Sequence, residues 1–131
     1  MNAVPIRSGD DVVRVRQLVR TAAAENGLSL VDQTKLVTAA SELARNTLVH
    51  GGGGTATVEV VKSPIGRVGV KLSFNDEGPG IADIDLALTD GWTSGSGLGL
   101  GLSGARRLVD EFELNSKPGA GTSVVVVKWS R

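Results

Sequence analysis

Three short stretches of the sequence carry residues whose types and spacing could act on a nucleotide. The first contains Glu42, Asn46 and His50 at intervals of four, so a helix would align them along one polar stripe. The amide oxygen of Asn46 could ligate Mg²⁺, and a carboxylate one turn away could accept a proton from an attacking hydroxyl. The alternatives are a solvated helix face and a histidine that interacts with the helix dipole.

The second stretch, Asn75-Asp76-Glu77-Gly78-Pro79-Gly80, follows an alternating apolar pattern that ends at Phe74. Continuing the alternation places Asp76 on the core-facing side, where a carboxylate needs a hydrogen-bond partner. If the protein supplies none, the amino group of adenine is a natural donor, and Gly78 and Gly80 would leave room for the base. The alternative is an ordinary turn after a strand.

The third stretch, Thr93–Leu108, reads TSGSGLGLGLSGARRL and contains a literal G-x-G-x-x-G. A dinucleotide fingerprint needs a preceding strand and an acidic residue about 20 positions later, and both are missing here. A Walker P-loop is excluded because the chain contains no Gly-Lys pair. The glycines before a helix could still wrap phosphate oxygens. The alternative is a flexible surface loop.

The elements that position these stretches follow from the apolar periodicity. Asp10 or Asp11 is expected to cap the first helix, and Ser29 with Asp32 resembles a capping box at the second. Adjacent strand pairs predict an α/β two-layer sandwich, with a mixed, mostly antiparallel sheet and its helices on one face. The expected elements are a strand at 4–6, helices at about 12–26 and 29–50, a hairpin at about 56–74, a short helix near 84–88, a helix after Leu98, and strands at about 111–116 and 122–129.

Composition narrows the class of protein. The chain has 131 residues, enough for one domain spanning 1–131. Equal numbers of basic and acidic residues, 14 each, give no support for nucleic acid or membrane partners. The absence of cysteine excludes disulfides and thiolate metal sites. We find no secretory signal pattern or membrane-length apolar segment and expect a cytoplasmic protein.

Together the stretches resemble a known superfamily. Glu42-x-x-x-Asn46-x-x-x-His50, Asp76-x-Gly78-x-Gly80 and Gly97-x-Gly99-x-Gly101, in this order, are similar to the N, G1 and G2 boxes of the GHKL ATPases. The run 119–122, Gly-Ala-Gly-Thr, resembles the closing Gly-x-Gly-Thr element of that superfamily. The resemblance implies a Bergerat fold, the histidine-kinase-like ATPase fold, which binds Mg-ATP.

The resemblance also implies a role for individual residues. Asn46 would ligate Mg²⁺, and Glu42 would be the general base. Asp76 would accept a hydrogen bond from the adenine amino group, with Thr122 nearby through a water. Segment 81–96 would be the ATP lid. The remaining ATP-binding positions, first at the base and then at the phosphates, would be Gly78, Gly80, Gly97, Leu98, Gly99, Leu100 and Gly101. Candidate cations for the γ-phosphate are Arg45, Arg106 and Arg107.

Within the superfamily, SELARN at 41–46 and the terminal VKWSR are most similar to the anti-sigma-factor serine kinases, in particular the stressosome switch type. That similarity implies phosphorylation of serine or threonine on STAS-domain antagonist or scaffold proteins. It also implies activation of a PP2C-type phosphatase in a stress-signalling cascade that acts on a sigma factor. Two alternatives are an ATP-binding anti-sigma factor or adaptor with little catalysis, and the detached ATPase domain of a histidine kinase.

Overall fold

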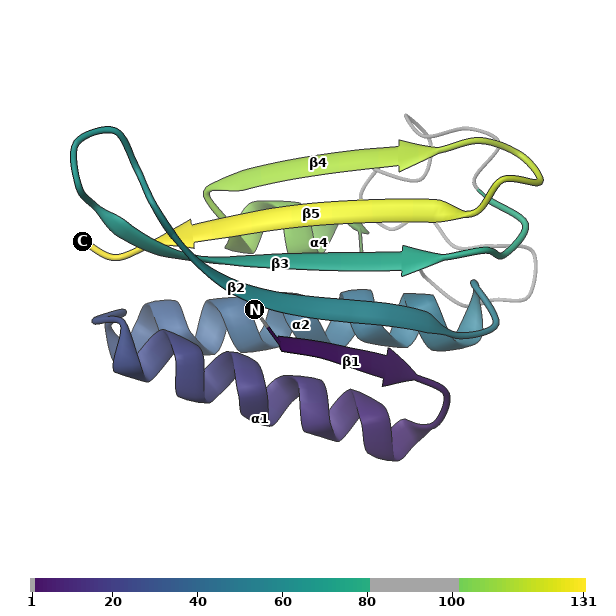
Figure 1. Ribbon diagram of the computed structural model, residues 1–131, viewed down its shortest axis with the longest axis horizontal. Coiled ribbons are helices and arrows are strands. Elements are labelled where there is room, and N and C mark those ends of the chain that lie inside the picture. The colour runs from purple at the N-terminus through teal and green to yellow at the C-terminus, as the bar shows by residue number, and fades with distance from the viewer. Residues whose placement is uncertain (1, 81–101) are drawn as a thin grey trace.

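The computed structural model describes residues 2–80 and 102–131. Its sheet has five antiparallel strands in the order β1-β2-β3-β5-β4, and the described helices cover one face of it (Figure 1). The predicted two-layer fold class is therefore confirmed. The elements are β1 (Asn2–Ile6), α1 (Gly9–Glu25), α2 (Leu30–Val49), β2 (Gly54–Lys62), β3 (Val68–Asp76), α4 (Leu102–Leu108), β4 (Glu111–Ser116) and β5 (Thr122–Trp129).

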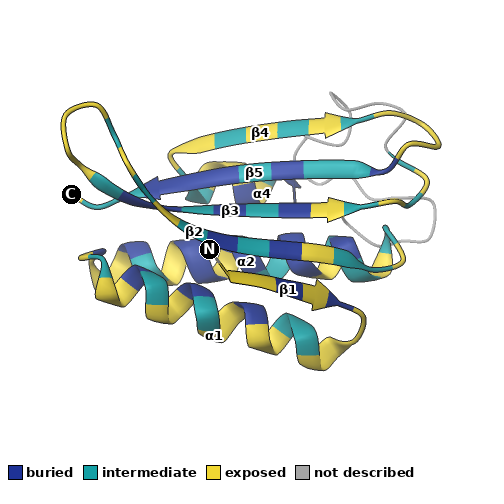
Figure 2. Cartoon of the chain, viewed as in Figure 1, coloured by how far each residue is buried: buried dark blue, intermediate teal, exposed yellow. Residues whose placement is uncertain are grey.

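The core lies between the sheet and the helices. Alternate residues of the central strands are buried on the helix side, and buried positions follow one side of each helix (Figure 2). Phe74 of β3 is paired in register with Ala56 of β2 and Val124 of β5, so buried side chains of neighbouring strands form a continuous layer. Burying a side chain as large as Phe74 contributes about 1.5–3 kcal/mol.

The helix starts differ in part from the expectation. The N-cap of α1 is Ser8, whose side chain makes no capping hydrogen bond, so the predicted cap at Asp10 or Asp11 is wrong. The helix begins earlier, at Gly9. Both carboxylates lie in its first turn, where their negative charge interacts favourably with the positive end of the helix dipole. The Asp11 carboxylate accepts a hydrogen bond from the backbone N–H of Arg7 at 2.8 Å.

The second helix makes one of the two hydrogen bonds of the expected capping box. Ser29 Oγ accepts a hydrogen bond from the backbone N–H of Asp32 at 3.1 Å, as a capping box requires. The carboxylate of Asp32 does not return to Ser29; it is buried and pairs with Lys128 and Arg131. None of the described helices combines the length and the apolar character that crossing a bilayer requires.

The final strands have the predicted bounds, 111–116 and 122–129. The predicted short helix near 84–88 and the positions 97–101 lie outside the described residues. The helix expected after Leu98 is described from Leu102.

Candidate functional site

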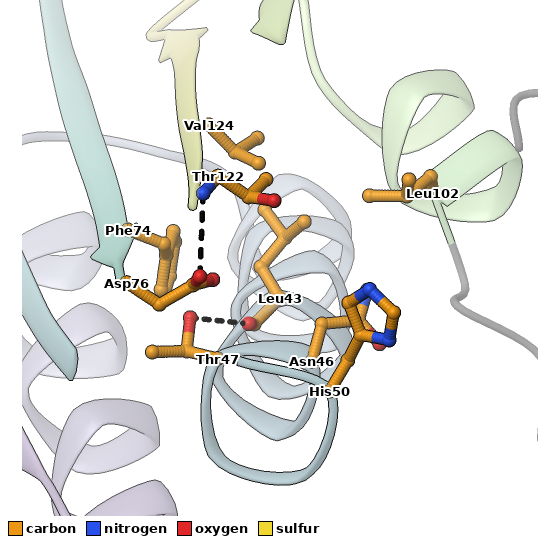
Figure 3. A pocket seen from close by; sticks show the side chains of 9 residues that line it. All are labelled: Leu43, Asn46, Thr47, His50, Phe74, Asp76, Leu102, Thr122 and Val124. Atoms are coloured by element: carbon orange, nitrogen blue, oxygen red, sulfur yellow. Dashed lines mark hydrogen bonds between the residues drawn. The ribbon is translucent and has the colours of Figure 1, made fainter. Parts of the chain in front are cut away.

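A pocket opens at the end of the sheet where β3 finishes and β5 begins, between α2 and α4 (Figure 3). The space among its lining residues, open solvent included, is about 320 Å³. It brings together Asn46, Asp76 and Thr122, which belong to separate stretches of the sequence. The other residues that line it are Leu43, Thr47, His50, Phe74, Leu102 and Val124.

Asp76 is the polar centre of the pocket. Its Oδ1 accepts hydrogen bonds from the backbone N–H groups of Gly78 at 2.9 Å and Thr122 at 3.2 Å. No hydrogen bond from the described residues reaches Oδ2. The protein therefore orients the carboxylate through one oxygen and leaves the other with acceptor capacity for a ligand donor.

Glycines let the backbone close tightly around this carboxylate. A Cβ added at Gly51 would overlap the Asp76 side chain, and one added at Gly121 would overlap the Asp76 backbone carbonyl. Gly78 in turn packs against the backbone of Gly51. The contact of Gly51 with Asp76 joins residues distant in the sequence and depends on the fold.

Two further contacts hold the turn at 78–80 beside the pocket. His50 Nε2 lies 3.3 Å from the carbonyl oxygen of Gly80, and the backbone N–H of Gly119 donates to the carbonyl of Pro79 at 2.7 Å. His50 is the C-cap residue of α2, so it joins the end of that helix to the turn. The sequence had offered a dipole interaction for His50, and the structure adds this contact.

The helix α2 presents the N-box residues as the spacing predicts. Asn46 lines the pocket and is half-buried, and Glu42 lies one turn earlier, also half-buried, outside the pocket lining. Thr47 is a buried pocket residue that the sequence reasoning missed. Its hydroxyl donates to the carbonyl of Leu43 at 3.0 Å. Its position beside Asn46, on the buried side of the helical stripe, is the feature that could have identified it.

Thr122 lies next to Asp76, to which its backbone N–H donates, and its proposed role at the adenine stays a prediction. Its Oγ1 lies 3.0 Å from Ser116 Oγ, which fixes the hydroxyl at the start of β5. Arg45, Arg106 and Arg107 are exposed on α2 and α4, and none of them lines the pocket. The cation for the γ-phosphate therefore stays a prediction, as do the roles of residues 97–101.

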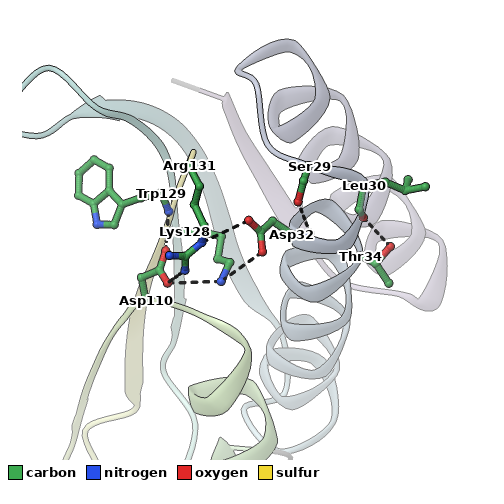
Figure 4. Close-up of polar contacts among 8 residues, drawn as sticks. All are labelled: Ser29, Leu30, Asp32, Thr34, Asp110, Lys128, Trp129 and Arg131. Atoms are coloured by element: carbon green, nitrogen blue, oxygen red, sulfur yellow. Dashed lines mark hydrogen bonds and ion pairs between the residues drawn. The ribbon is translucent and has the colours of Figure 1, made fainter.

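A buried ionic network lies at the opposite end of β5, where that strand approaches the start of α2 (Figure 4). Lys128 Nζ is 3.6 Å from Asp32 Oδ1 and 3.3 Å from Asp110 Oδ1. Arg131 pairs with both carboxylates, at 3.5 and 2.8 Å. Because Lys128 and Asp32 are buried, this network fixes the first turn of α2 against the sheet, and so helps to orient the helix that carries Glu42 and Asn46.

The network also sets the ionisation of Asp110. Burial raises the pKa of its carboxyl group, but the hydrogen bond from the backbone N–H of Trp129 and the charges of Lys128 and Arg131 outweigh that effect. The net result is a pKa below the usual range for an aspartate.

Comparison with known proteins identifies the family of the chain. Residues 31–130 match the family described as histidine kinase-, DNA gyrase B- and HSP90-like ATPase. The chain is 45% identical over 130 residues to the serine/threonine-protein kinase RsbT of Bacillus subtilis, covering 99% of this chain and 97% of that protein. It is 29% identical over 117 residues to an anti-sigma F factor of a Thermoanaerobacter species, covering 87% of this chain and 82% of the relative.

Solved structures share the fold. The RsbU and RsbW domains of Rv1364c from Mycobacterium tuberculosis align with a TM-score of 0.64 at 23% identity, covering all of this chain and 33% of that one. The catalytic domain of the histidine kinase ThkA aligns with a TM-score of 0.56 at 13% identity, covering 99% and 97% of the two chains. Because the family model matches most of the chain and the fold agrees with it, the chain belongs to the histidine kinase-, DNA gyrase B- and HSP90-like ATPase family.

Proposed function

We propose that this chain transfers the γ-phosphate of ATP to a serine or threonine of a STAS-domain protein. The observation that carries the proposal is the pocket that unites Asn46, Asp76 and Thr122 from distant stretches. The chain resembles the serine/threonine-protein kinase RsbT over nearly the whole length of both. It is accordingly a protein-serine/threonine kinase that uses ATP.

The residues present fit the adenine end of ATP. Oδ2 of Asp76 receives no hydrogen bond from the described residues, which suits the exocyclic amino group of the base. Glycine at position 51 lets the backbone lie against the Asp76 side chain without displacing it. Thr122 and Phe74 line the same pocket and would border the base.

The residues of α2 fit the phosphate end. The Asn46 side-chain oxygen would be a Mg²⁺ ligand, since Mg²⁺ commonly takes one or two protein ligands together with phosphate oxygens and waters. The metal would neutralise the charge of the phosphates. Glycines 97, 99 and 101, with Leu98 and Leu100, would contribute backbone N–H groups to the phosphates, and segment 81–96 would cover the nucleotide.

In the transfer step, the acceptor hydroxyl oxygen forms a bond to the γ-phosphorus while the bond from that phosphorus to the β–γ bridging oxygen breaks, releasing ADP. Glu42 takes the proton of the acceptor hydroxyl. It lies one helical turn from Asn46 and is half-buried, so it remains accessible to a second protein. Such a base typically contributes about 10²–10⁴-fold to a rate.

The biological role that we propose is partner switching in the cytoplasm. Phosphorylation of a STAS-domain antagonist or scaffold would release this kinase, which would then bind and activate a PP2C-type phosphatase of a stress-signalling cascade. Support comes from the similarity to RsbT and to anti-sigma F factors. The latter also favour a second candidate, an ATP-binding anti-sigma factor that works mainly by protein binding.

The nucleotide site is tested by calorimetric titration with Mg-ATP, Mg-GTP and NAD. We expect binding of Mg-ATP, a loss of at least tenfold in affinity for Asp76→Asn, and loss of the Mg²⁺ dependence for Asn46→Ala. The matched control is Asn75→Ala, an exposed neighbour on β3, which should bind as the wild type does. Wild-type affinity in Asp76→Asn would contradict the placement of the base. Partner binding without phosphate transfer by the wild type would favour the anti-sigma alternative.

A further inference from the structure

The outward face of α2 forms one continuous stripe that includes Glu42. Six positions lie on this face, of which five are exposed and the sixth, Glu42, is half-buried. Their spacing of four, three, four, three and four residues keeps them within about 80° of arc on an α-helix. We name this set, together with Leu30 at the start of the helix, the α2 stripe: Leu30, Val31, Lys35, Thr38, Glu42, Arg45 and Val49.

The α2 stripe carries three exposed apolar side chains. Leu30 is 76% exposed, Val31 64% and Val49 56%, and Leu30 points away from the ionic network and the sheet (Figure 4). The hydroxyl of Thr38 donates to the carbonyl of Thr34 at 2.8 Å, within the helix. The hydroxyl hydrogen of Thr38 is therefore already bonded within the helix. Leu30 and Val31 lie together at the start of the helix and Val49 lies at its end, so a protein that covers the whole stripe would bury exposed apolar side chains at both ends.

Positive charge is concentrated on the helix layer, to which α2 belongs. Although the whole chain has equal numbers of acidic and basic residues, the exposed ionisable residues of α1, α2 and α4 are mostly cationic. Asp10 and Glu25 are the exposed carboxylates of these described helices. The exposed cations are Arg14, Arg16, Arg20, Lys35, Arg45, Arg106 and Arg107. This layer therefore attracts an acidic surface, which the net charge of the sequence does not reveal.

We propose that the α2 stripe is the docking surface for the phosphoacceptor protein, whose contacting surface is acidic opposite Lys35 and Arg45 and apolar opposite the two ends of the stripe. This inference rests on the proposed function. The occupant follows from Glu42, since the acceptor hydroxyl must reach this residue and the acceptor protein must then cover the stripe on either side of it. Val31 lies about 17 Å from Glu42 along the helix axis and Val49 about 10 Å in the other direction.

These spans are within the reach of one small domain. A small folded domain is about 30 Å across, which is the length of a 20-residue helix such as α2. A single acceptor domain can therefore contact Val31 while its hydroxyl lies at Glu42. A second copy of this chain is disfavoured as the occupant, because a two-fold contact through this face would bring cationic surfaces together.

The experiment measures binding and phosphorylation of each purified STAS-domain protein of the source organism. The variants are Val31→Asp and Lys35→Glu. Matched controls are Ile65→Asp, at an 82% exposed position in the β2–β3 turn, and Lys62→Glu, exposed at the end of β2. Both variants should fold. In Val31→Asp the new carboxylate interacts favourably with the N-terminal end of the helix dipole, and in Lys35→Glu the two residues have similar helix propensities. Thermal unfolding and ATP affinity verify this.

We expect Val31→Asp to raise the Kd and the KM for the acceptor at least tenfold at saturating ATP, with kcat unchanged. Lys35→Glu should raise both several-fold and weaken the salt dependence of association. The controls should behave as the wild type does. Wild-type affinity in both stripe variants, or equal losses in the controls, would overturn the proposal.

The remaining outcomes separate this inference from the proposed function. A wild-type chain that phosphorylates the acceptor, with stripe variants of unchanged Kd and KM, refutes the docking surface alone. A wild-type chain that binds the acceptor through the stripe but transfers no phosphate refutes the kinase function and leaves the surface standing. If Val31→Asp abolishes self-association or binding of a nucleic acid while acceptor binding persists, the stripe serves that other partner and the proposal is wrong.

Discussion

Replacing Gly51 with alanine tests whether the pocket depends on the position of one carboxylate. The new Cβ would lie 2.5 Å from Asp76 Oδ2 and 2.6 Å from Asp76 Cβ, whereas ordinary contact begins at 3.4 Å. The carboxylate must therefore move by about 1 Å, which is enough to break hydrogen bonds of 2.9 and 3.2 Å to the N–H groups of Gly78 and Thr122.

The expected cost follows from the bonds involved. A hydrogen bond to a charged group is worth about 1.5–3 kcal/mol, so loss of the bond between Asp76 and adenine should weaken ATP binding by about ten- to a hundredfold. Crowding by the added methyl group should also lower the free energy of unfolding by about 1–3 kcal/mol. Titration calorimetry gives the affinity, and thermal or urea unfolding gives the stability.

Gly52→Ala is the matched control. Gly52 has φ +75° with open space at its Cβ position, so alanine there costs about 1–2 kcal/mol in backbone strain without touching Asp76. The two variants should lose similar stability, but only Gly51→Ala should lose affinity for ATP. Equal affinities in the two folded variants would refute the reasoning that Asp76 binds the base.

Three further predictions concern the anchoring of α2. Because the pKa of Asp110 is lowered in the folded state, its contribution to stability is present above the unfolded pKa of about 3.9. That contribution is lost as pH falls through the folded pKa. Asp110→Asn should therefore reduce the pH dependence of the free energy of unfolding, measured with urea, over this acidic range. Lys128→Met leaves the buried carboxylate of Asp32 short of a partner and should cost about 3 kcal/mol by the same assay. Ser29→Ala should cost about 1 kcal/mol, because it removes the bond to the Asp32 N–H.

The sequence predicted the elements that have strong periodicity. The alternation in β2 and β3 and the turn-bounded final strands were placed correctly, because burial of one face imposes a period of two. The cap of α1 was misplaced, since Asp10, Asp11 and Ser8 are all suitable cap residues and the choice depends on where the chain leaves β1. Spacing alone cannot separate these candidates.

The structure brings three of the predicted site residues together, and the contacts that support them were not predicted. Asn46, Asp76 and Thr122 meet in the pocket as the motif order implied. The packing of Gly51 against Asp76 and the network of Asp32 with Lys128 join residues distant in sequence. No local pattern specifies such contacts, because they depend on the register of the sheet and on the helix that covers it.

The segregation of charge was also beyond the sequence reasoning. Zero net charge was interpreted as the absence of broad electrostatic attraction, but that sum includes residues on every surface. Arg16, Lys35 and Arg106 are far apart in the chain, and the fold exposes all of them on the helix layer. A local field of one sign can therefore exist on a neutral protein.

The most direct test of the central claim incubates the wild type and Glu42→Gln with labelled Mg-ATP and a STAS-domain acceptor. We predict acid-stable phosphate on serine or threonine of the acceptor with the wild type. Glu42→Gln should lose at least a hundredfold in transfer rate while it binds ATP with unchanged affinity. Acid-labile phosphohistidine, or wild-type transfer by Glu42→Gln, would contradict the account.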